Sequence, residues 1–240
     1  MKTIALIPAR LESRRFPNKL IKKLGGIPII VRTYQAALDT KLFDEVYVVS
    51  GNNEIIDLIK SVNGLTFKST QTHQSGTDRI AEAAKKIDHD IVVNLQGDEP
   101  FINIDAINNL ISSFENNSVV MASLMTNFKT LNEIKNPNHV KVTTDSDNNA
   151  IFFSRSPIPK KVKDLSEYKR HIGVYAFRKD TLINFASLQR SKNEISENLE
   201  GNRAIDNLIP IKMVKINFHG VSIDTEEDFL DAEKYLLKND

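Results

Sequence analysis

Residues 3–10 read TIALIPAR, an apolar run of strand length that ends in a proline and a cation. Similar runs recur at 46–49, 91–95 and 119–124, where nearly every position is hydrophobic. Strands of this composition are buried on both faces, as in a parallel sheet. Amphipathic segments of helical length occur at 28–39, 53–62, 77–87 and 104–115. The alternation of strand and helix predicts a doubly wound α/β layer.

The second half of the chain is less regular. Apolar runs at 139–144 and 150–153 flank the polar cluster 145–149, which predicts a β-hairpin. Further strands are expected at 171–177 and 212–217, and helices at 180–188, 195–207 and 226–237. Thr225 is well placed as the N-cap of the last helix, because acidic residues follow it in the first turn. We expect one domain over residues 1–240, with an antiparallel excursion at about 136–160.

The composition of the chain excludes several classes of binding partner and of chemistry. The 240 residues are 40% hydrophobic, and their net charge of +1 offers no overall field for nucleic acid or a membrane surface. There is no cysteine, which excludes disulfides, thiolate metal sites and cysteine nucleophiles and suits a reducing compartment. The first apolar run is too short for a secretory signal, and no stretch has the length of a membrane span. We therefore expect a cytoplasmic protein.

A loop rich in cations follows the first strand, with Arg10, Arg14, Arg15 and Lys19 in it. Ligands of open α/β sheets bind at the carboxyl ends of strands, so this loop lies where a phosphate chain would be held. A solvated basic loop without a ligand is the alternative. No glycine stands between the strand and Lys19, so neither a Walker A loop nor the dinucleotide fingerprint is present. An ATPase or a dehydrogenase is therefore not expected.

Two aspartates are candidates for a metal site. Asp98 follows an expected strand in the motif NLQGDEP, at 94–100, and Asp224 directly precedes the last helix. Carboxylate and phosphate oxygens, completed by water, are the ligands that Mg²⁺ prefers. Alternatively, Asp98 orders its own loop as an Asx-turn. The two aspartates would form a magnesium site if the fold brings them together.

A third motif, HQSGTDR at 73–79, directly precedes an expected helix. Gly76 would let a base or ribose approach the backbone, and the helix N-terminus offers unpaired amide groups to an anion. Ordinary N-capping by Ser75 or Thr77 is the structural interpretation, with Arg79 paired to a nearby acid. Both interpretations hold together, because a cap would shape the loop that binds the nucleotide.

These motifs, in this order, resemble those of the CMP-Kdo synthetases, the 3-deoxy-manno-octulosonate cytidylyltransferases. The likeness includes IPAR at 7–10 with Ser13, Arg15, Pro17 and Lys19, and then the two motifs at 73–79 and 94–100. It continues through NPN at 136–138, VKV at 140–142, FSR at 153–155, Ile158 and Pro159, HIGVY at 171–175 and IDTEED at 223–228. Order and spacing agree over nearly the whole chain.

The resemblance implies a fold and a set of roles. The fold would be a Rossmann-like nucleotidyltransferase three-layer sandwich, with a predominantly parallel central sheet and a small antiparallel excursion used for dimerisation. The implied nucleotide-binding residues are Ala9, Arg10, Ser13, Arg15, Lys19, Gln74, Ser75, Gly76 and Arg79. The implied residues of the sugar site are Gln96, Arg155, His171, Tyr175 and Glu200. The implied catalytic residues are Arg10, Arg15, Lys19, Asp98 and Asp224, of which the two aspartates would bind Mg²⁺.

In the implied reaction, the anomeric hydroxyl of Kdo attacks the α-phosphorus of CTP and pyrophosphate leaves, for lipopolysaccharide biosynthesis by a homodimer. The sequence departs from the family at 199–203, which read LEGNR where the family usually has LEQLR. This change concerns the identity of the sugar more than the reaction. A cytidylyltransferase for a related acid, such as 8-amino-Kdo or a sialic-acid-like sugar, is an alternative, as is a nucleotide-binding regulator without catalysis. His171 is either a general base or a structural hydrogen-bonding group.

Overall fold

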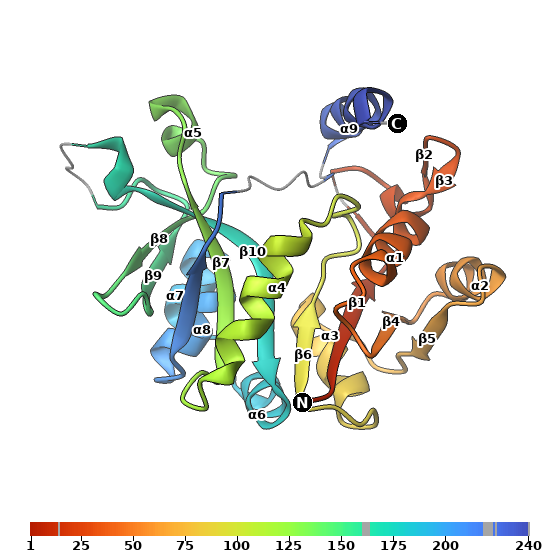
Figure 1. Ribbon diagram of the computed structural model, residues 1–240, viewed down its shortest axis with the longest axis horizontal. Coiled ribbons are helices and arrows are strands. Elements are labelled where there is room, and N and C mark those ends of the chain that lie inside the picture. Colours follow the sequence, from red (N-terminus) through yellow and green to blue (C-terminus); the bar gives the residue numbers. More distant parts are fainter. Residues whose placement is uncertain (14, 160–163, 218–222, 224, 240) are drawn as a thin grey trace. The chain divides into compact units, whose positions relative to one another are not determined.

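The computed structural model describes residues 1–13, 15–159, 164–217, 223 and 225–239 (Figure 1). The chain divides into two compact units. The first comprises Met1–Ile104 and Gly220–Asp240, and the second comprises Asp105–His219. Each contains strands covered by helices. That the two act as one domain stays a prediction.

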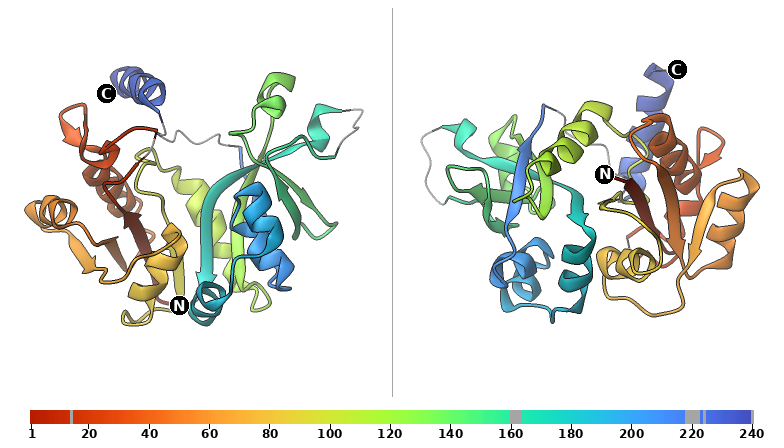
Figure 2. Two further views of the ribbon diagram at one scale, coloured as in Figure 1. Left: turned by 180° about the vertical axis from the view of Figure 1, so that it is seen from behind. Right: turned by 60° about the horizontal axis from the view of Figure 1, so that its bottom comes forward.

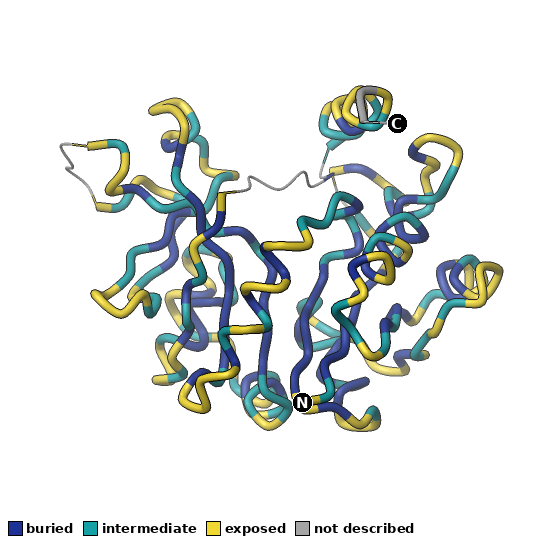
Figure 3. The backbone as a smooth tube through the Cα atoms, in the orientation of Figure 1, coloured by how far each residue is buried: buried dark blue, intermediate teal, exposed yellow. Residues whose placement is uncertain are grey.

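The first unit is built around a parallel sheet. Its central strand β1 (Thr3–Ala9) is buried along its whole length and pairs with β4 (Glu45–Ser50) and β6 (Ile91–Asn94). Strand β5 (Leu65–Lys68) extends the sheet beyond β4 and is also parallel. Figure 3 shows β1 and β6 buried and the surrounding loops exposed. The parallel sheet that the continuous apolar runs predict is therefore confirmed, whereas the short, half-exposed β5 was not expected.

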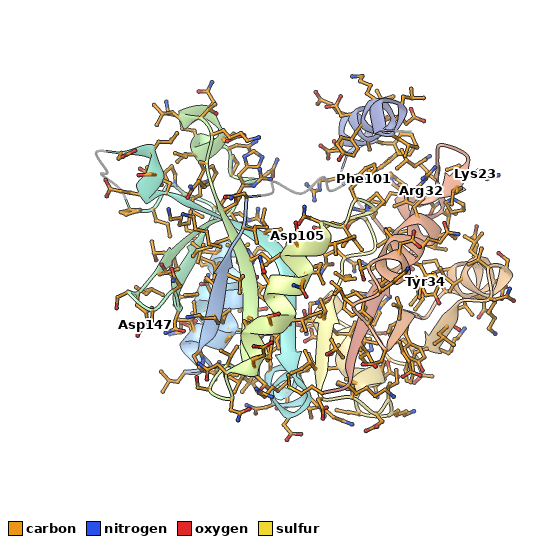
Figure 4. The ribbon with its side chains drawn as sticks, in the orientation of Figure 1. Lys23, Arg32, Tyr34, Phe101, Asp105 and Asp147 are labelled. Carbon is orange, nitrogen blue, oxygen red and sulfur yellow. The ribbon has the colours of Figure 1, made fainter. Side chains whose placement is uncertain are left out.

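Helices cover both faces of this sheet. Helix α1 (Ile29–Asp39) and helix α2 (Asn53–Ser61) contact each other on one face, and α3 (Gly76–Ala84) lies on the other (Figures 1 and 2). The remaining elements of this unit are the 3₁₀ turn η1 (Lys19–Ile21), β2 (Lys23–Leu24), β3 (Ile27–Pro28) and α9 (Glu226–Asn239). Helix α9 packs through two edge-to-face ring pairs, Phe16 with Phe229 at 5.8 Å and Phe101, labelled in Figure 4, with Tyr235 at 4.7 Å.

The second unit is a mixed sheet centred on β7 (Met121–Asn127). Strand β11 (Ile211–Lys215) is parallel to β7, and β10 (Lys169–Arg178) is antiparallel to it. Strand β10 also pairs with β8 (Lys141–Thr144), which forms an antiparallel hairpin with β9 (Ala150–Ser154). The hairpin predicted from the polar cluster at 145–149 is therefore confirmed. Its turn is closed by the Asp145 carboxylate, which accepts the amides of Asp147 and Asn149 at 2.9 and 2.7 Å.

The helices of the second unit lie on both faces of its strands, with α4 on one face and α7 and α8 on the other (Figures 1 and 2). They are α4 (Ile104–Ser112), α5 (Leu131–Lys135), α6 (Lys179–Ser187), α7 (Lys192–Glu197) and α8 (Gly201–Asp206). The 3₁₀ turns are η2 (Ser113–Glu115) and η3 (Leu165–Glu167). The predicted α/β class with a mostly parallel central sheet is thus confirmed.

One predicted helix is wrong in its extent. The segment 195–207 is not one helix but belongs to α7 and α8, with a break at Asn198. Asn198 caps α7 in the left-handed conformation, with φ 53° and ψ 48°, which ends a right-handed helix. Thr225 does cap α9 as predicted: its hydroxyl oxygen accepts the Asp228 amide at 3.1 Å, and the Asp228 carboxylate accepts the Thr225 amide at 2.8 Å. In the described part of the chain, no helix combines the length and apolar character that crossing a membrane requires.

Candidate active site

The basic loop after β1 is held at both ends. At its start, the Leu11 amide donates to Asn52 Oδ1 at 3.3 Å. At its end, the buried ring of Phe16 packs on Phe229 of α9. Arg10, just before the first anchor, and Arg15, just before the second, are exposed; Ser13 between the anchors is half-buried, and Arg14 lies outside the described residues. The loop therefore presents its cations from a fixed base at the carboxyl end of β1.

A second arginine, Arg79, contacts the end of β1 at the residue directly before Arg10. Arg79 of α3 donates a hydrogen bond from Nη1 to the carbonyl oxygen of Ala9, the last residue of β1. Burial, and then the charge of Arg10, lower the pKa of Arg79 from its ordinary value. Like charges repel, and a bound anion that contacts both arginines would relieve the repulsion. The arrangement suits a phosphate group.

The motif at 73–79 forms the N-terminus of α3, and Ser75 is its cap. Ser75 Oγ accepts the Asp78 amide and the Asp78 carboxylate accepts the Ser75 amide, both at 3.1 Å, which is a capping box. Thr77 is buried and instead accepts a hydrogen bond from Asn94 Nδ2 of β6 at 2.9 Å. A Cβ on Gly76 would lie 3.0 Å from Pro8 Cγ. Glycine therefore lets this segment lie against the end of β1.

Glu82 lies one helical turn after Asp78 in α3 and holds the chain that precedes this helix. Its carboxylate accepts hydrogen bonds from Ser69 at 2.7 Å and from Thr70 at 3.0 Å, and it contacts His73 Nε2 at 2.8 Å. Desolvation would raise the pKa of Glu82, but these hydrogen bonds outweigh it and lower the pKa to about 2. Glu82 thus stays ionised and tethers the chain just before Gln74, which is exposed.

Asp98 forms a hydrogen bond with the last cation of the basic loop. Its carboxylate accepts a hydrogen bond from Lys19 Nζ, which also donates to the Ile223 carbonyl oxygen at 2.9 Å. The Ile223 amide donates to the Asp98 carbonyl oxygen at 3.0 Å. The chain immediately before Asp224 therefore runs beside Asp98, although Asp224 itself lies outside the described residues. The partner of the Asp98 carboxylate is Lys19 and not the surrounding backbone, so the Asx-turn interpretation is not supported.

The donor chemistry around Asp98 fits a magnesium ion. Its side chain is 22% exposed, so a carboxylate oxygen is within reach of a ligand. The described residues contain no cluster of three or more metal-ligating side chains. Mg²⁺ does not need one, because it is commonly held by one or two carboxylates together with substrate phosphates and water.

The residues predicted for the sugar site divide between the two units. Gln96 belongs to the first unit, where its Nε2 donates to Asn94 Oδ1 at 3.4 Å and its Oε1 lies near Gly76. The other four, Arg155, His171, Tyr175 and Glu200, belong to the second unit.

An aromatic cluster brings His171 and Tyr175 together in the second unit. Their ring centroids are 5.3 Å apart, and the Phe153 ring stands edge-on to His171 at 4.7 Å. A Cβ on Gly201 would lie 2.6 Å from Phe153 Cε2 and 2.9 Å from the Tyr175 hydroxyl oxygen. Desolvation, and then the charge of Glu200, raise the pKa of Tyr175 well above its ordinary value. Tyr175 is therefore a neutral hydroxyl at any working pH.

Arg155 is fixed by backbone carbonyl groups. Its guanidinium donates to the carbonyl oxygens of Glu197 and Pro137, each at 3.1 Å. Its own carbonyl oxygen accepts a hydrogen bond from Lys141 Nζ at 2.7 Å. Lys141 is fully buried, and burial lowers its pKa from the ordinary value. These contacts hold Arg155 in place without neutralising its charge.

Comparisons with known proteins identify the family. The family model for cytidylyltransferases matches residues 4–212. The 3-deoxy-manno-octulosonate cytidylyltransferase of Flavobacterium johnsoniae is 47% identical over 244 residues, which cover 100% of both chains. The protein of the same name from Christiangramia forsetii is 45% identical over 241 residues, or 98% of this chain and 97% of the relative. The chain belongs to the 3-deoxy-manno-octulosonate cytidylyltransferase family.

A solved structure supports the same conclusion. It is that of CMP:2-keto-3-deoxy-manno-octonic acid synthetase complexed with CTP. It superposes with a TM-score of 0.93 at 30% identity and covers 100% of both chains. The recognition of the cytidylyltransferase family from the sequence is confirmed, while the roles of the individual site residues stay predictions.

The run LEGNR, in which this cytidylyltransferase departs from the family pattern, has a structural explanation. The Asn202 side chain is fully buried and pairs with the backbone of Phe153, accepting its amide at 3.0 Å and donating to its carbonyl oxygen at 2.9 Å. Arg203 is also buried and forms two hydrogen bonds with the Glu194 carboxylate, at 2.8 and 2.7 Å. Sequence reasoning missed these pairings because nothing in the local pattern indicates the partner.

His171 is expected to remain neutral at physiological pH. Desolvation lowers its pKa to about 3, whereas the unfolded chain titrates near the ordinary value of 6.5. The unfolded state therefore binds the proton more readily, so stability is fully present above pH 6.5 and is lost as the pH falls toward 3. Between pH 7 and pH 5 the loss from this group should reach about 2 kcal/mol.

Urea unfolding of the wild type and of His171→Gln at these two pH values measures the contribution of His171. The variant should lose about 2 kcal/mol less on acidification than the wild type does. Equal losses in the two proteins would contradict the assignment. A histidine with such a low pKa is a weak base. This argues against His171 acting as the general base.

Proposed function

We propose that this chain transfers CMP from CTP to 3-deoxy-manno-octulosonate and releases pyrophosphate, in the pathway to lipopolysaccharide. The observation that carries the proposal is the contact of Lys19 with Asp98, which joins the basic loop after β1 to the acidic end of β6. A cation for phosphate and a carboxylate for a metal ion lie there side by side. The matched relatives, at up to 47% identity over the full length, support the same reaction.

The nucleotide would be bound by the first unit. Arg10, Arg15 and Lys19 offer positive charge to the triphosphate, and arginine grips phosphate oxygens with two parallel hydrogen bonds. The capped N-terminus of α3, at Ser75 and Gly76, offers amide groups and a close backbone approach to the cytidine. Nucleotidyl transfer relies mainly on positioning and electrostatic stabilisation, so the reaction needs no covalent nucleophile from the protein.

Asp98 would bind Mg²⁺, and Asp224 is proposed as the second carboxylate. When bound, the ion would supply positive charge that offsets the charge of the α-phosphate and lowers the pKa of the attacking hydroxyl. Lys19, which donates a hydrogen bond to Asp98, would keep that carboxylate oriented. Arg15 and Lys19 would stabilise the charge on the departing pyrophosphate.

Residues of the second unit would contact the sugar acid. Arg155 would offer its guanidinium to the carboxylate of the sugar, and Tyr175 and Glu200 would offer hydrogen-bonding groups to its hydroxyls. We further propose a homodimer in the cytoplasm. The absence of cysteine suits a reducing compartment.

Steady-state pyrophosphate release tests the function. Release should require CTP, Mg²⁺ and Kdo together, with little turnover when UTP or ATP replaces CTP. A parallel series replaces Kdo by 8-amino-Kdo and by a sialic acid. Efficient use of one of these acids beside negligible use of Kdo would overturn the choice of sugar, and CTP binding without any release would indicate a regulator.

A further inference from the structure

Strand β10 contains a bulge between its two site residues. In its antiparallel pairing with β7, Ile172 faces Leu124 and Tyr175 faces Ser123. One step on β7 thus corresponds to three steps on β10, so Gly173 and Val174 are extra residues. Side chains four residues apart on a regular strand are separated by about 13 Å. Here the rings of His171 and Tyr175 are 5.3 Å apart, because the bulge makes them next neighbours on one face.

The side chain of Ser123 spans this bulge. It is fully buried, and its Oγ lies 2.8 Å from the Val174 carbonyl oxygen, 3.3 Å from the Ile172 carbonyl oxygen and 2.8 Å from His171 Nε2. A serine hydroxyl has one proton to donate, and two of these three neighbours are carbonyl oxygens that can only accept. One hydroxyl therefore contacts the bulge, at the carbonyl oxygens of Ile172 and Val174, and also the predicted sugar-site histidine.

These distances select one form of the imidazole. If the hydroxyl proton points to Val174, Oγ is free to accept a hydrogen bond from Nε2–H of His171. If the proton points instead to His171, Oγ and the Val174 carbonyl oxygen are two acceptors at 2.8 Å with no proton between them. The first arrangement satisfies every group, so the neutral ring carries its proton on Nε2 and its lone pair on Nδ1.

The lone pair on Nδ1 has a chemical consequence. Within the described part of the chain, Nδ1 of His171 has no hydrogen-bond partner, and the residue as a whole keeps a small exposed fraction. Burial lowers the pKa of His171 to about 3, so Nδ1 stays unprotonated. A neutral acceptor of this kind suits a hydroxyl group and not a carboxylate, which has no proton to donate.

We propose that Ser123 is a positioning residue of the sugar-acid site, because its hydroxyl holds the bulge of β10 and fixes His171 as the Nε2–H tautomer, which accepts a sugar hydroxyl at Nδ1. The part of this inference that concerns the sugar rests on the proposed function. The part that concerns the tautomer does not.

The tautomer is measured first, without substrate. Two-bond ¹H–¹⁵N spectra of the imidazole groups in the full-length protein distinguish a protonated Nε2 from a protonated Nδ1. Comparison with His171→Gln identifies the signals of His171 among those of the five histidines. The wild type should show the Nε2–H form, and Ser123→Ala should shift it toward a mixture. An Nδ1–H form in the wild type would overturn the proposal whatever the enzyme's substrate.

Kinetics test the role in the site. In Ser123→Ala the KM for the sugar acid should rise by about 3- to 10-fold, the usual effect of one hydrogen bond, while the KM for CTP stays unchanged. Ser123→Thr keeps the hydroxyl and should restore both the tautomer and the KM. Thr126→Val, which removes another buried hydroxyl from β7, is the matched control. An equal effect in Thr126→Val, or an unchanged KM in Ser123→Ala, would overturn the positioning role.

The two hypotheses fail in different ways. If no sugar acid is turned over by the wild type, the proposed function fails, but the tautomer measurement still decides whether Ser123 orients His171. If the wild type is active and Ser123→Ala changes neither the tautomer nor the KM, only the present inference fails.

Discussion

Replacing Asp98 by asparagine should lower kcat by about 10²- to 10³-fold, the usual cost of one preorganised catalytic charge. The fold should survive, because the Asp98 side chain is partly exposed and its backbone contacts with Ile223 do not involve the carboxylate. The substitution keeps the shape of the side chain but removes the charge that would bind Mg²⁺ and pair with Lys19. Pyrophosphate release at saturating CTP and sugar acid measures the effect.

Asp57→Asn provides the matched control for this experiment. Asp57 is an exposed residue of α2 in the same unit, and its replacement should leave kcat unchanged. The Mg²⁺ titration of Asp98→Asn should also shift to higher concentration, which a simple loss of folded protein would not produce. Turnover of Asp98→Asn equal to that of the wild type would refute the metal assignment. Asp224→Asn should behave in the same way if the two carboxylates share the ion.

Replacing Arg203 by leucine should lower the free energy of unfolding by about 3–5 kcal/mol, because a buried carboxylate loses its principal partner. The side chains of Arg203 and Glu194 are only 2% and 3% exposed, and two hydrogen bonds join them. The Arg203 guanidinium also lies over the Phe185 ring, 4.6 Å from its centroid. Urea unfolding followed by circular dichroism measures the change.

Arg190→Leu is the matched control, because Arg190 contacts the same carboxylate of Glu194. Its Nε lies 3.1 Å from Glu194 Oε1, but its side chain is 37% exposed, so the loss should stay below about 1 kcal/mol. Equal losses in the two variants would show that burial does not determine how much an ion pair with Glu194 contributes to the free energy of unfolding. The folded fraction of Arg203→Leu should keep a normal KM for CTP, since Arg203 lies in the second unit and does not belong to the predicted nucleotide site.

The candidate site was partly readable from the sequence. Ser75 and Thr225 are each followed three positions later by an aspartate, a pattern that predicts a helix N-terminus. The structure confirms both caps. The basic loop and Asp98 were placed correctly at the ends of strands because parallel strands all point their carboxyl ends to one edge of a sheet. The helix break at Asn198 was not foreseen, because asparagine is compatible with both helical and left-handed backbone.

What the sequence determined by itself is the order of strands and helices, the caps and the family, because periodicity and turn residues act over a few positions. Only the tertiary structure decided which distant groups meet. Lys19 and Asp98 are 79 residues apart, and Ser123 and His171 are 48 apart. The run LEGNR shows the difference most directly, because the partner of Asn202 is the backbone of Phe153, 49 residues earlier. Such a partner depends on the path of the intervening chain, which no local pattern encodes.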